Sequence, residues 1–213
     1  MYRLLMKIRF IIIVSLLVLS NSLYAQKETS KYKLGLNYGQ ASQDNFILGD
    51  TDYNYNNHFL KVQVNYLIST SNKWNYELTI EPSIYFVKYQ LLNEQFIRPT
   101  DPNYMELREL YTQKRRFNEY ALNIGLIVRY ALLRNFSTYI QGSVGPMISG
   151  DDTERLKKGF AFSDILGLGF SWKQNNVILD LRFTLRHNSN LDLSLPNSGH
   201  NSAGIETGVL FNL

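Results

Sequence analysis

The sequence predicts an all-β protein, an eight-stranded antiparallel transmembrane β-barrel with short periplasmic turns and long extracellular loops. Three observations support this fold class. Apolar side chains recur at every second position, the positions between them are polar or small, and short connections alternate with long ones. No stretch after the first 25 residues is long and apolar enough for a transmembrane helix, so a membrane protein of this kind has to be a closed barrel.

The first 25 residues have the pattern of a secretory signal peptide. Basic residues flank an apolar run over residues 10–19, and small residues precede a cleavage site after Ala25. A membrane anchor is the alternative, but the run is about half of the roughly 20 residues that a spanning helix needs. We therefore expect residues 1–25 to be removed and residues 26–213 to form a single outer-membrane barrel domain.

Charge and cysteine content exclude several classes of function. Arg3, Lys7 and Arg9 lie in the leader with no acid beside them, so the net charge of +4 falls to +1 in the mature domain. This weak charge gives no reason to expect a nucleic-acid partner. The chain has no cysteine, its three histidines lack carboxylates at matching spacing, and it has no glycine-rich phosphate loop. We expect no disulfide, no metal site and no cofactor.

Period-two alternation divides the mature chain into eight strands. Most of them reach or exceed the roughly 9–11 residues that a tilted membrane-spanning strand needs. An even number of strands places both ends of the barrel on the periplasmic side. We expect strands over residues 31–39, 57–68, 74–89, 120–132, 136–148, 160–172, 177–187 and 202–213.

The two faces of the expected strand over residues 177–187 differ in polarity. A soluble ligand-binding barrel, the main alternative fold, would place the apolar face inside. The other face carries Asp180, Arg182 and Arg186, which indicates charges inside and apolar groups facing lipid. A narrow pore is not expected, because side chains about fill the interior of an eight-stranded barrel.

The connections between these strands alternate in length, as in outer-membrane barrels. The segment over residues 91–119 is either an extended hairpin tip or a short helix. We expect the short connections, residues 69–73, 133–135 and 173–176, on the periplasmic side, and the long ones, residues 41–56, 91–119, 149–159 and 188–201, on the extracellular side.

Parity along the seventh strand brings His187 and Ser189 to the lipid-facing row at its extracellular end. Residues i and i+2 lie on one face with Cα atoms roughly 6.5–7 Å apart, so the imidazole can reach the serine hydroxyl. An imidazole that takes the hydroxyl proton activates serine for attack on an ester. A polar residue beside a loop serine is the alternative interpretation of this spacing.

The residues around this pair carry a resemblance to a known family. Residues 186–190 read Arg-His-Asn-Ser-Asn, and residues 195–202 read Leu-Pro-Asn-Ser-Gly-His-Asn-Ser before a final strand. This stretch resembles the lipid A 3-O-deacylase (acyloxyacyl hydrolase) family of outer-membrane β-barrels. The resemblance implies a serine hydrolase of the bacterial outer membrane that removes an ester-linked 3-hydroxyacyl chain from lipid A.

The resemblance also implies roles for single residues. His187 matches the family's base, Ser189 its nucleophile and Asn190 the side chain offered to the oxyanion, with a backbone N–H near Asp192 as the second donor. In the family this stretch commonly reads Ser-Asn-Ala-Gly, whereas here Leu191 and Asp192 follow Asn190.

The residue expected to orient His187 is an amide. The family usually has a glutamate in a Pro-Asn-x-Gly-x-Glu-Ser stretch, and the matching position here is Asn201. An amide oxygen can still accept the imidazole N–H, although it stabilises the imidazolium less than a carboxylate does. Parity points Asn201 outward, and it turns Glu206, the nearest acid, toward the interior.

Four other polar features receive weaker interpretations. We expect His200 to be a solvated loop histidine and His58 a polar residue at a strand end. The basic run over residues 114–116 is expected to be solvated, with pairing to lipid A phosphates as the alternative. Asp164 falls in an apolar row that should face lipid, and we expect a β-bulge to turn it inward.

Two functions follow from these patterns. The first is an outer-membrane serine esterase that deacylates lipid A, with lipopolysaccharide as substrate and partner. The alternative is a non-catalytic barrel that serves as an envelope scaffold or a surface-interaction protein. The sequence leaves open which acyl chain or lipid is cut, whether the activity is latent in its own membrane, and the oligomeric state.

Overall fold

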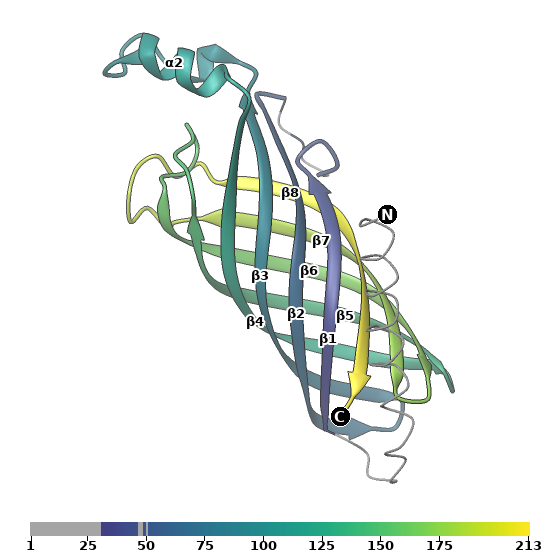
Figure 1. Ribbon diagram of the computed structural model, residues 1–213. Coiled ribbons are helices and arrows are strands. Elements are labelled where there is room, and N and C mark those ends of the chain that lie inside the picture. The colour runs from purple at the N-terminus through teal and green to yellow at the C-terminus, as the bar shows by residue number, and fades with distance from the viewer. Residues whose placement is uncertain (1–30, 47–48, 50) are drawn as a thin grey trace, which may run out of the picture. The chain divides into compact units, whose positions relative to one another are not determined.

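The computed structural model describes residues 31–46, 49 and 51–213, which form a closed barrel of eight antiparallel strands (Figure 1). Each strand pairs with its neighbours in chain order, and β8 returns to pair with β1. The prediction of eight strands is confirmed, whereas the expected signal peptide lies outside the described residues. The strands are β1 (Tyr32–Ser42), β2 (Tyr53–Ser71), β3 (Trp74–Leu91), β4 (Arg115–Leu133), β5 (Phe136–Ser149), β6 (Gly159–Gln174), β7 (Val177–Ser189) and β8 (His200–Asn212).

Alternate residues point into the barrel and out of it, because the side chains of a strand have a period of two. In β7, Asp180, Arg182 and Arg186 are buried, whereas Leu179 and Phe183 are 47% and 48% exposed. The predicted arrangement, with charges inside and apolar groups outside, is confirmed. It is the pattern of a barrel whose outer wall contacts lipid.

Ion pairs fill the middle of the barrel. Arg182 has no exposed surface and lies 2.8 Å from Glu81 and 3.0 Å from Glu206. Lys61 lies 2.8 Å from the same Glu206. Buried charges are tolerated when they are paired in this way. Glu206 therefore faces the interior, as its parity predicts.

The outer wall is an apolar belt that ends in aromatic side chains near the short turns. Tyr32 packs on Tyr66 with ring centroids 5.1 Å apart, and Trp74 packs on Tyr130 at 4.7 Å. Aromatic residues at this level are typical of the membrane–water interface. Exposed apolar residues of the belt include Leu34, Leu36, Leu122, Ile124, Leu126, Ile140, Val144, Leu166, Leu168, Leu179 and Phe183.

Strands β2 and β4 extend further outward than the sequence indicates. β2 begins at Tyr53 and β4 at Arg115, and the last β3–β4 pair joins Tyr89 to Arg115. The expected starts at residues 57 and 120 are therefore wrong. Polar residues such as Asn56 and Lys88 occupy the outward row there. The apolar alternation fades because these ends lie beyond the apolar belt, while backbone pairing still continues.

The segment between β3 and β4 contains both structures that the sequence left open. The hairpin extends outward, and its tip contains the short helices η2 (Glu94–Phe96) and α2 (Tyr104–Thr112), which lie beyond the strand ends (Figure 1). Tyr111 of α2 packs on Leu91 and Ile97, which fixes the helix to the hairpin. Within the described residues, no helix is long and apolar enough to cross a membrane.

Candidate active site

His187 and Ser189 lie on the outward row of β7, at the end that leads into a long loop. Both side chains are partly exposed, whereas Asn188 between them is buried. Across the β6–β7 pair, Asp164 lies opposite His187 and Phe162 lies opposite Ser189. The pair therefore faces the lipid side of the wall, which is the orientation expected from parity.

Asn201 holds the imidazole of His187 from the β8 side. The two residues are partners in the β7–β8 register, and Nδ1 of His187 lies 2.7 Å from Oδ1 of Asn201. An amide oxygen only accepts hydrogen bonds, so in the neutral imidazole Nδ1 donates and carries the proton. Nε2 is then unprotonated and can take a proton from a hydroxyl group.

Gly199 packs against the edge of the same ring. A Cβ at this position would lie 3.0 Å from Cε1 of His187 and 2.5 Å from the carbonyl oxygen of Asn188. Its φ of +71° is also in the left-handed region, which side chains rarely adopt. The sequence motif contains this glycine, but its packing against the histidine has no signal in the sequence.

Ser189 is near His187 but is not hydrogen-bonded to it. In the described part of the chain, His187 bonds through its ring only to Asn201. Residues i and i+2 share one strand face with Cα atoms roughly 6.5–7 Å apart, so rotation of the side chains can bring the serine hydroxyl to the imidazole. Catalytic hydrogen bonds are often long before substrate binds and shorten in the complex.

A tight turn follows Ser189. The Leu193 N–H donates to the carbonyl oxygen of Asn190 at 3.1 Å, and Leu191 and Asp192 have φ values of 52° and 59°. Two consecutive positive φ values are those of a type I′ turn, which is strained in residues other than glycine. Within the residues that the structure describes, the N–H groups of Leu191 and Asp192 donate no hydrogen bond.

The side chain of Asn190 faces the inside of this loop. It has no exposed surface, and its Nδ2 donates to the carbonyl oxygen of Ser194 at 2.7 Å and to Oγ of Ser194 at 3.0 Å. The backbone N–H of Asn190 donates to Oδ1 of Asn197 at 2.7 Å. In this arrangement Asn190 shapes the turn. Its expected role as an oxyanion donor requires release of the amide from Ser194 and stays a prediction.

The inner face of the same strand is anchored by buried polar contacts. Arg186 lies 2.8 Å from Glu119, and its guanidinium stacks over the ring of Tyr85 at 3.6 Å. Asn188 donates to the hydroxyl of Tyr55 at 3.1 Å and to Glu119 at 3.3 Å. These contacts hold the backbone of β7 in place directly behind His187 and Ser189.

The prediction that His200 is a solvated loop histidine is wrong. It is 1% exposed, stacks on Tyr55 with ring centroids 4.7 Å apart, and places Nε2 3.0 Å from Oγ1 of Thr153. The physical reason is that β8 begins at His200, opposite Asn188, and not at residue 202. The longer strand puts His200 on the inward row, where it supports the end of the barrel beneath the site.

A second extracellular loop, residues 150–158, braces the loop that follows β7. Leu156 forms a β-bridge with Asn197, and the Gly199 N–H donates to the carbonyl oxygen of Arg155 at 3.0 Å. These contacts fix Gly199, and through it the edge of the imidazole. Pairing between two loops leaves no periodic signal in the sequence, so the sequence did not predict it.

The prediction that a bulge turns Asp164 inward is also wrong. The register runs without a shift past this residue, with Val144 opposite on β5 and His187 opposite on β7. Asp164 is partly exposed and keeps the outward parity of its strand. The hydrogen-bonded pairing of β6 with β5 and with β7 continues without interruption through Asp164. No extra residue is therefore inserted that would rotate its side chain inward.

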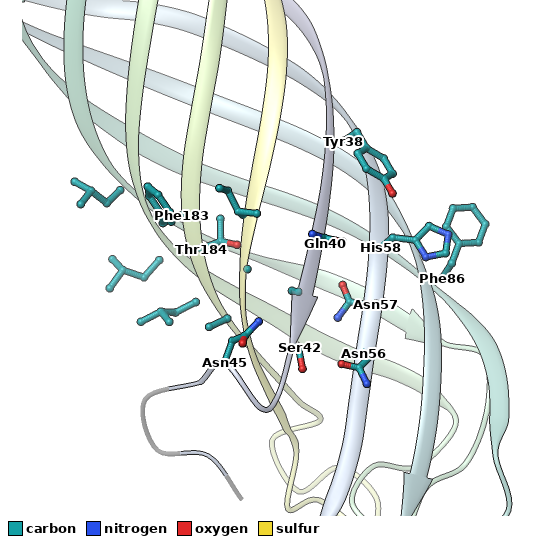
Figure 2. Close-up of a pocket in the computed structure, with 18 of the residues that line it drawn as sticks. Tyr38, Gln40, Ser42, Asn45, Asn56, Asn57, His58, Phe86, Phe183 and Thr184 are labelled. Carbon is teal, nitrogen blue, oxygen red and sulfur yellow. The ribbon is translucent and has the colours of Figure 1, made fainter.

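His58 lies within β2 and not at its end. β2 begins at Tyr53, which places His58 on the exposed outer face, where it stacks on Phe86 of β3 at 4.9 Å (Figure 2). The expected position at a strand end is therefore wrong. The physical reason is again the outward extension of β2.

The basic run over residues 114–116 divides into two kinds of residue. Lys114 and Arg116 are exposed, as expected for solvated charges. Arg115 is partly buried, lies 2.5 Å from Asp151 and packs over Tyr111. For Arg115 the expectation of a solvated charge is wrong, because the extracellular end of β4 brings it to the loop that follows β5.

A closed barrel with paired charges inside and an apolar outer wall is typical of bacterial outer-membrane proteins. This chain is a bacterial outer-membrane protein. The family model of lipid A 3-O-deacylase (PagL) matches residues 61–209, so the chain belongs to that family. The matched residues include β7 and the loop that follows it.

Solved structures are also similar to this chain. The crystal structure of the outer membrane enzyme PagL is 14% identical, with a TM-score of 0.51, over 83% of this chain and 97% of that chain. Neisserial surface protein A is 13% identical, with a TM-score of 0.49, over 86% of this chain and 98% of that chain. No curated protein matches the chain. At 14% identity, the likeness to the structure of the outer membrane enzyme PagL concerns the fold alone.

Proposed function

We propose that this protein is an outer-membrane serine esterase that removes an ester-linked 3-hydroxyacyl chain from lipid A. One observation carries the proposal. In a chain of the lipid A 3-O-deacylase family, an imidazole oriented by Asn201 lies beside Ser189 on the lipid-facing wall. The acyl chains of a lipid substrate lie along this wall, so the ester can approach the serine from the membrane.

The proposed reaction uses Ser189 as the nucleophile. Its Oγ bonds to the ester carbonyl carbon while its proton passes to Nε2 of His187. The tetrahedral intermediate collapses with cleavage of the bond to the sugar oxygen, which takes the proton back from His187. Water then attacks the acyl-serine by the same route and releases the free hydroxy fatty acid. Asn201 keeps the required tautomer throughout.

The turn after Ser189 offers donors to the oxyanion. The unbonded N–H groups of Leu191 and Asp192 belong to the residues that directly follow Asn190. In other hydrolases, removal of one oriented oxyanion donor costs about 10²–10³ in kcat. Asn190 would add its amide only when a bound substrate competes with Ser194 for it.

The loop also presents an apolar surface to the substrate. Leu191, Leu193 and Leu195 are 66%, 68% and 78% exposed, at the outer end of the lipid-facing wall. Exposed apolar groups of this extent are typical of a lipid or ligand contact. They favour a substrate with long acyl chains over a water-soluble ester.

Expression in a bacterium of known lipid A composition tests the proposal. We expect a lipid A species lighter by one hydroxyacyl chain in the mass spectrum, and we expect Ser189→Ala and His187→Ala to abolish it. A shifted mobility on unheated gels controls for assembly of the barrel. Detergent-dispersed lipid A as substrate controls for latency in the membrane. An unchanged lipid A with assembled protein in both assays would support the non-catalytic scaffold instead.

A further inference from the structure

Three side chains from neighbouring strands form one row across the outer wall. Asp164 lies directly opposite His187 in the β6–β7 pair, and Asn201 lies directly opposite His187 in the β7–β8 pair. Opposite residues of antiparallel strands have Cβ atoms about 4.5–5.5 Å apart. The imidazole of His187 is therefore flanked by a carboxylate on one side and by an amide on the other.

A carboxylate at the position of Asp164 has an energetic cost. Phe162 and Leu166 are its neighbours on the outward row of β6, and Val144 is its partner on β5. Charged residues on the lipid face destabilise a barrel, most strongly near the bilayer midplane. Within the described residues, no lysine or arginine forms an ion pair with Asp164. His187 does not form an ion pair with it either, although the register places the two residues opposite each other.

In a serine hydrolase, the group beside the histidine orients the ring and stabilises the imidazolium by its charge. Asn201 can do only the first of these. Its amide oxygen, 2.7 Å from Nδ1, fixes the tautomer and the orientation of the ring. It carries no charge, so it gives little stabilisation to the imidazolium that forms as Ser189 attacks. A carboxylate in a triad supplies both the orientation and the charge.

Other charged groups around His187 point elsewhere. On its own strand, Arg186 is buried on the inner face, and on β8 His200 is buried on the inner side. In the loop that follows, Asp192 accepts a hydrogen bond from a neighbouring asparagine. Of the titratable groups that the structure describes on these elements, Asp164 is the one placed on the outward row beside the imidazole.

We propose that Asp164 is a positioning residue for the reaction, and that its carboxylate supplies the negative charge that stabilises the imidazolium of His187. The two tasks of a triad carboxylate are divided here, with orientation from Asn201 on β8 and charge from Asp164 on β6. This inference rests on the proposed function of Ser189 and His187. It also accounts for the presence of a carboxylate without an ion-pair partner on the lipid-facing wall.

The test compares Asp164→Asn with Asp164→Glu, using purified protein and detergent-dispersed lipid A. We expect Asp164→Asn to lower kcat about tenfold with little change in KM, because a charge acts on the transition state and not on substrate binding. Asp164→Glu, which keeps the charge, should retain most of the activity. Asp101→Asn, in the tip between β3 and β4, is the control for loss of a distant charge. Equal kcat values for the wild type and Asp164→Asn would contradict the inference.

A rescue experiment separates this role from a structural one. Asn201→Glu places a carboxylate on the other side of the same ring, so the double variant Asp164→Asn/Asn201→Glu should recover the kcat lost in Asp164→Asn. A residue needed only for folding of β6 would not be rescued from β8. Failure of the rescue in correctly assembled protein would overturn the proposed division of roles.

A substrate-independent measurement separates this inference from the proposed function. A fluorophosphonate labels a serine that is activated by a base, so labelling of the wild type but not of Ser189→Ala reports the state of Ser189. We expect Asp164→Asn to slow this labelling about tenfold, in parallel with kcat. Equal labelling of the wild type and Asp164→Asn would refute the role of Asp164 alone. An unlabelled wild type would contradict the serine esterase itself.

Discussion

The two faces of β7 differ in how many hydrogen-bond and ion-pair partners their polar side chains have. On the inner face, Arg182, Arg186 and Asn188 are at most 4% exposed, and each contacts a buried carboxylate or hydroxyl group. On the outer face, His187 has one ring partner, and Ser189 is not bonded to it. One strand therefore carries rigid structural contacts and unsatisfied chemical groups one residue apart.

This difference shows how a barrel can hold a precise site on its lipid side. The outer wall offers few polar partners, so it cannot fix a catalytic geometry by itself. Because side chains alternate along a strand, the buried ion pairs behind the site fix the backbone to which His187 and Ser189 belong. In the proposed mechanism, positioning comes from the inner face, and reactivity comes from the outer face.

Substitution of adjacent residues on the two faces should have opposite consequences. His187→Ala is expected to reduce deacylation at least about 10³-fold with unchanged resistance to unfolding, because it removes the base and no buried contact. Arg186→Ala leaves Glu119 buried without its ion-pair partner, 2.8 Å away in the wild type, and should cost about 3–5 kcal/mol of stability. The measurements are lipid A turnover and the urea concentration at which the fast-migrating gel form is lost. Equal stability of the two variants would remove the contrast between the faces.

Gly199→Ala tests whether the loop that contacts the outer face of β7 also positions His187. A Cβ there has to displace either the ring of His187 or the carbonyl oxygen of Asn188, and the φ of +71° disfavours alanine. We expect turnover to fall about 10–100-fold, because the edge of the imidazole that bears Nε2 moves. Gly142→Ala is the matched control, since a Cβ at that outward position of β5 meets no atom within 4 Å. Similar losses in both variants would mean that the barrel, and not the imidazole, is the affected part.

The inner and outer faces also differed in how far the sequence predicted them. Period-two alternation placed His187, Ser189 and Glu206 on the correct faces, because the register of a membrane strand is imposed by lipid on one side. The ends of strands were less predictable, since they lie beyond the apolar belt. His200 was misplaced for this reason, because two further residues of pairing carried it to the inner row.

Asp164 was misplaced for a different reason. A carboxylate in a lipid-facing row breaks the alternation of apolar and polar residues. A β-bulge that turns the side chain inward is the simplest way to restore this alternation. The structure keeps the register and accepts the charge, next to a histidine that lies 23 residues later in the sequence. No local pattern can show that two such residues are opposite each other. The departure of Asp164 from the apolar row is visible in the sequence, but only the strand pairing shows that it lies opposite His187.

The smallest expected effect separates two polar residues of β8 that lie on opposite faces. Asn201→Ala removes the acceptor for Nδ1 of His187, so the ring loses its preferred tautomer and orientation, and turnover should fall about tenfold. Glu206→Ala removes a carboxylate that pairs with Lys61 and Arg182 inside the barrel, so it should lower stability while assembled protein keeps most of its turnover. The comparison requires the same amount of assembled barrel, measured by unheated gel mobility, and turnover on detergent-dispersed lipid A.

Asn201→Glu sharpens the same comparison, because it adds a charge without removing the acceptor. Turnover at or above the wild-type level is expected, since a carboxylate oxygen accepts the same N–H and also stabilises the imidazolium. The gain should be modest as long as Asp164 already supplies a charge from β6, and larger in the Asp164→Asn background. If assembled Glu206→Ala lost more turnover than Asn201→Ala, the face that controls His187 would be the inner one. The outward row from Asp164 through His187 to Asn201 would then be structural, and the chemistry would have to be sought among the buried ion pairs.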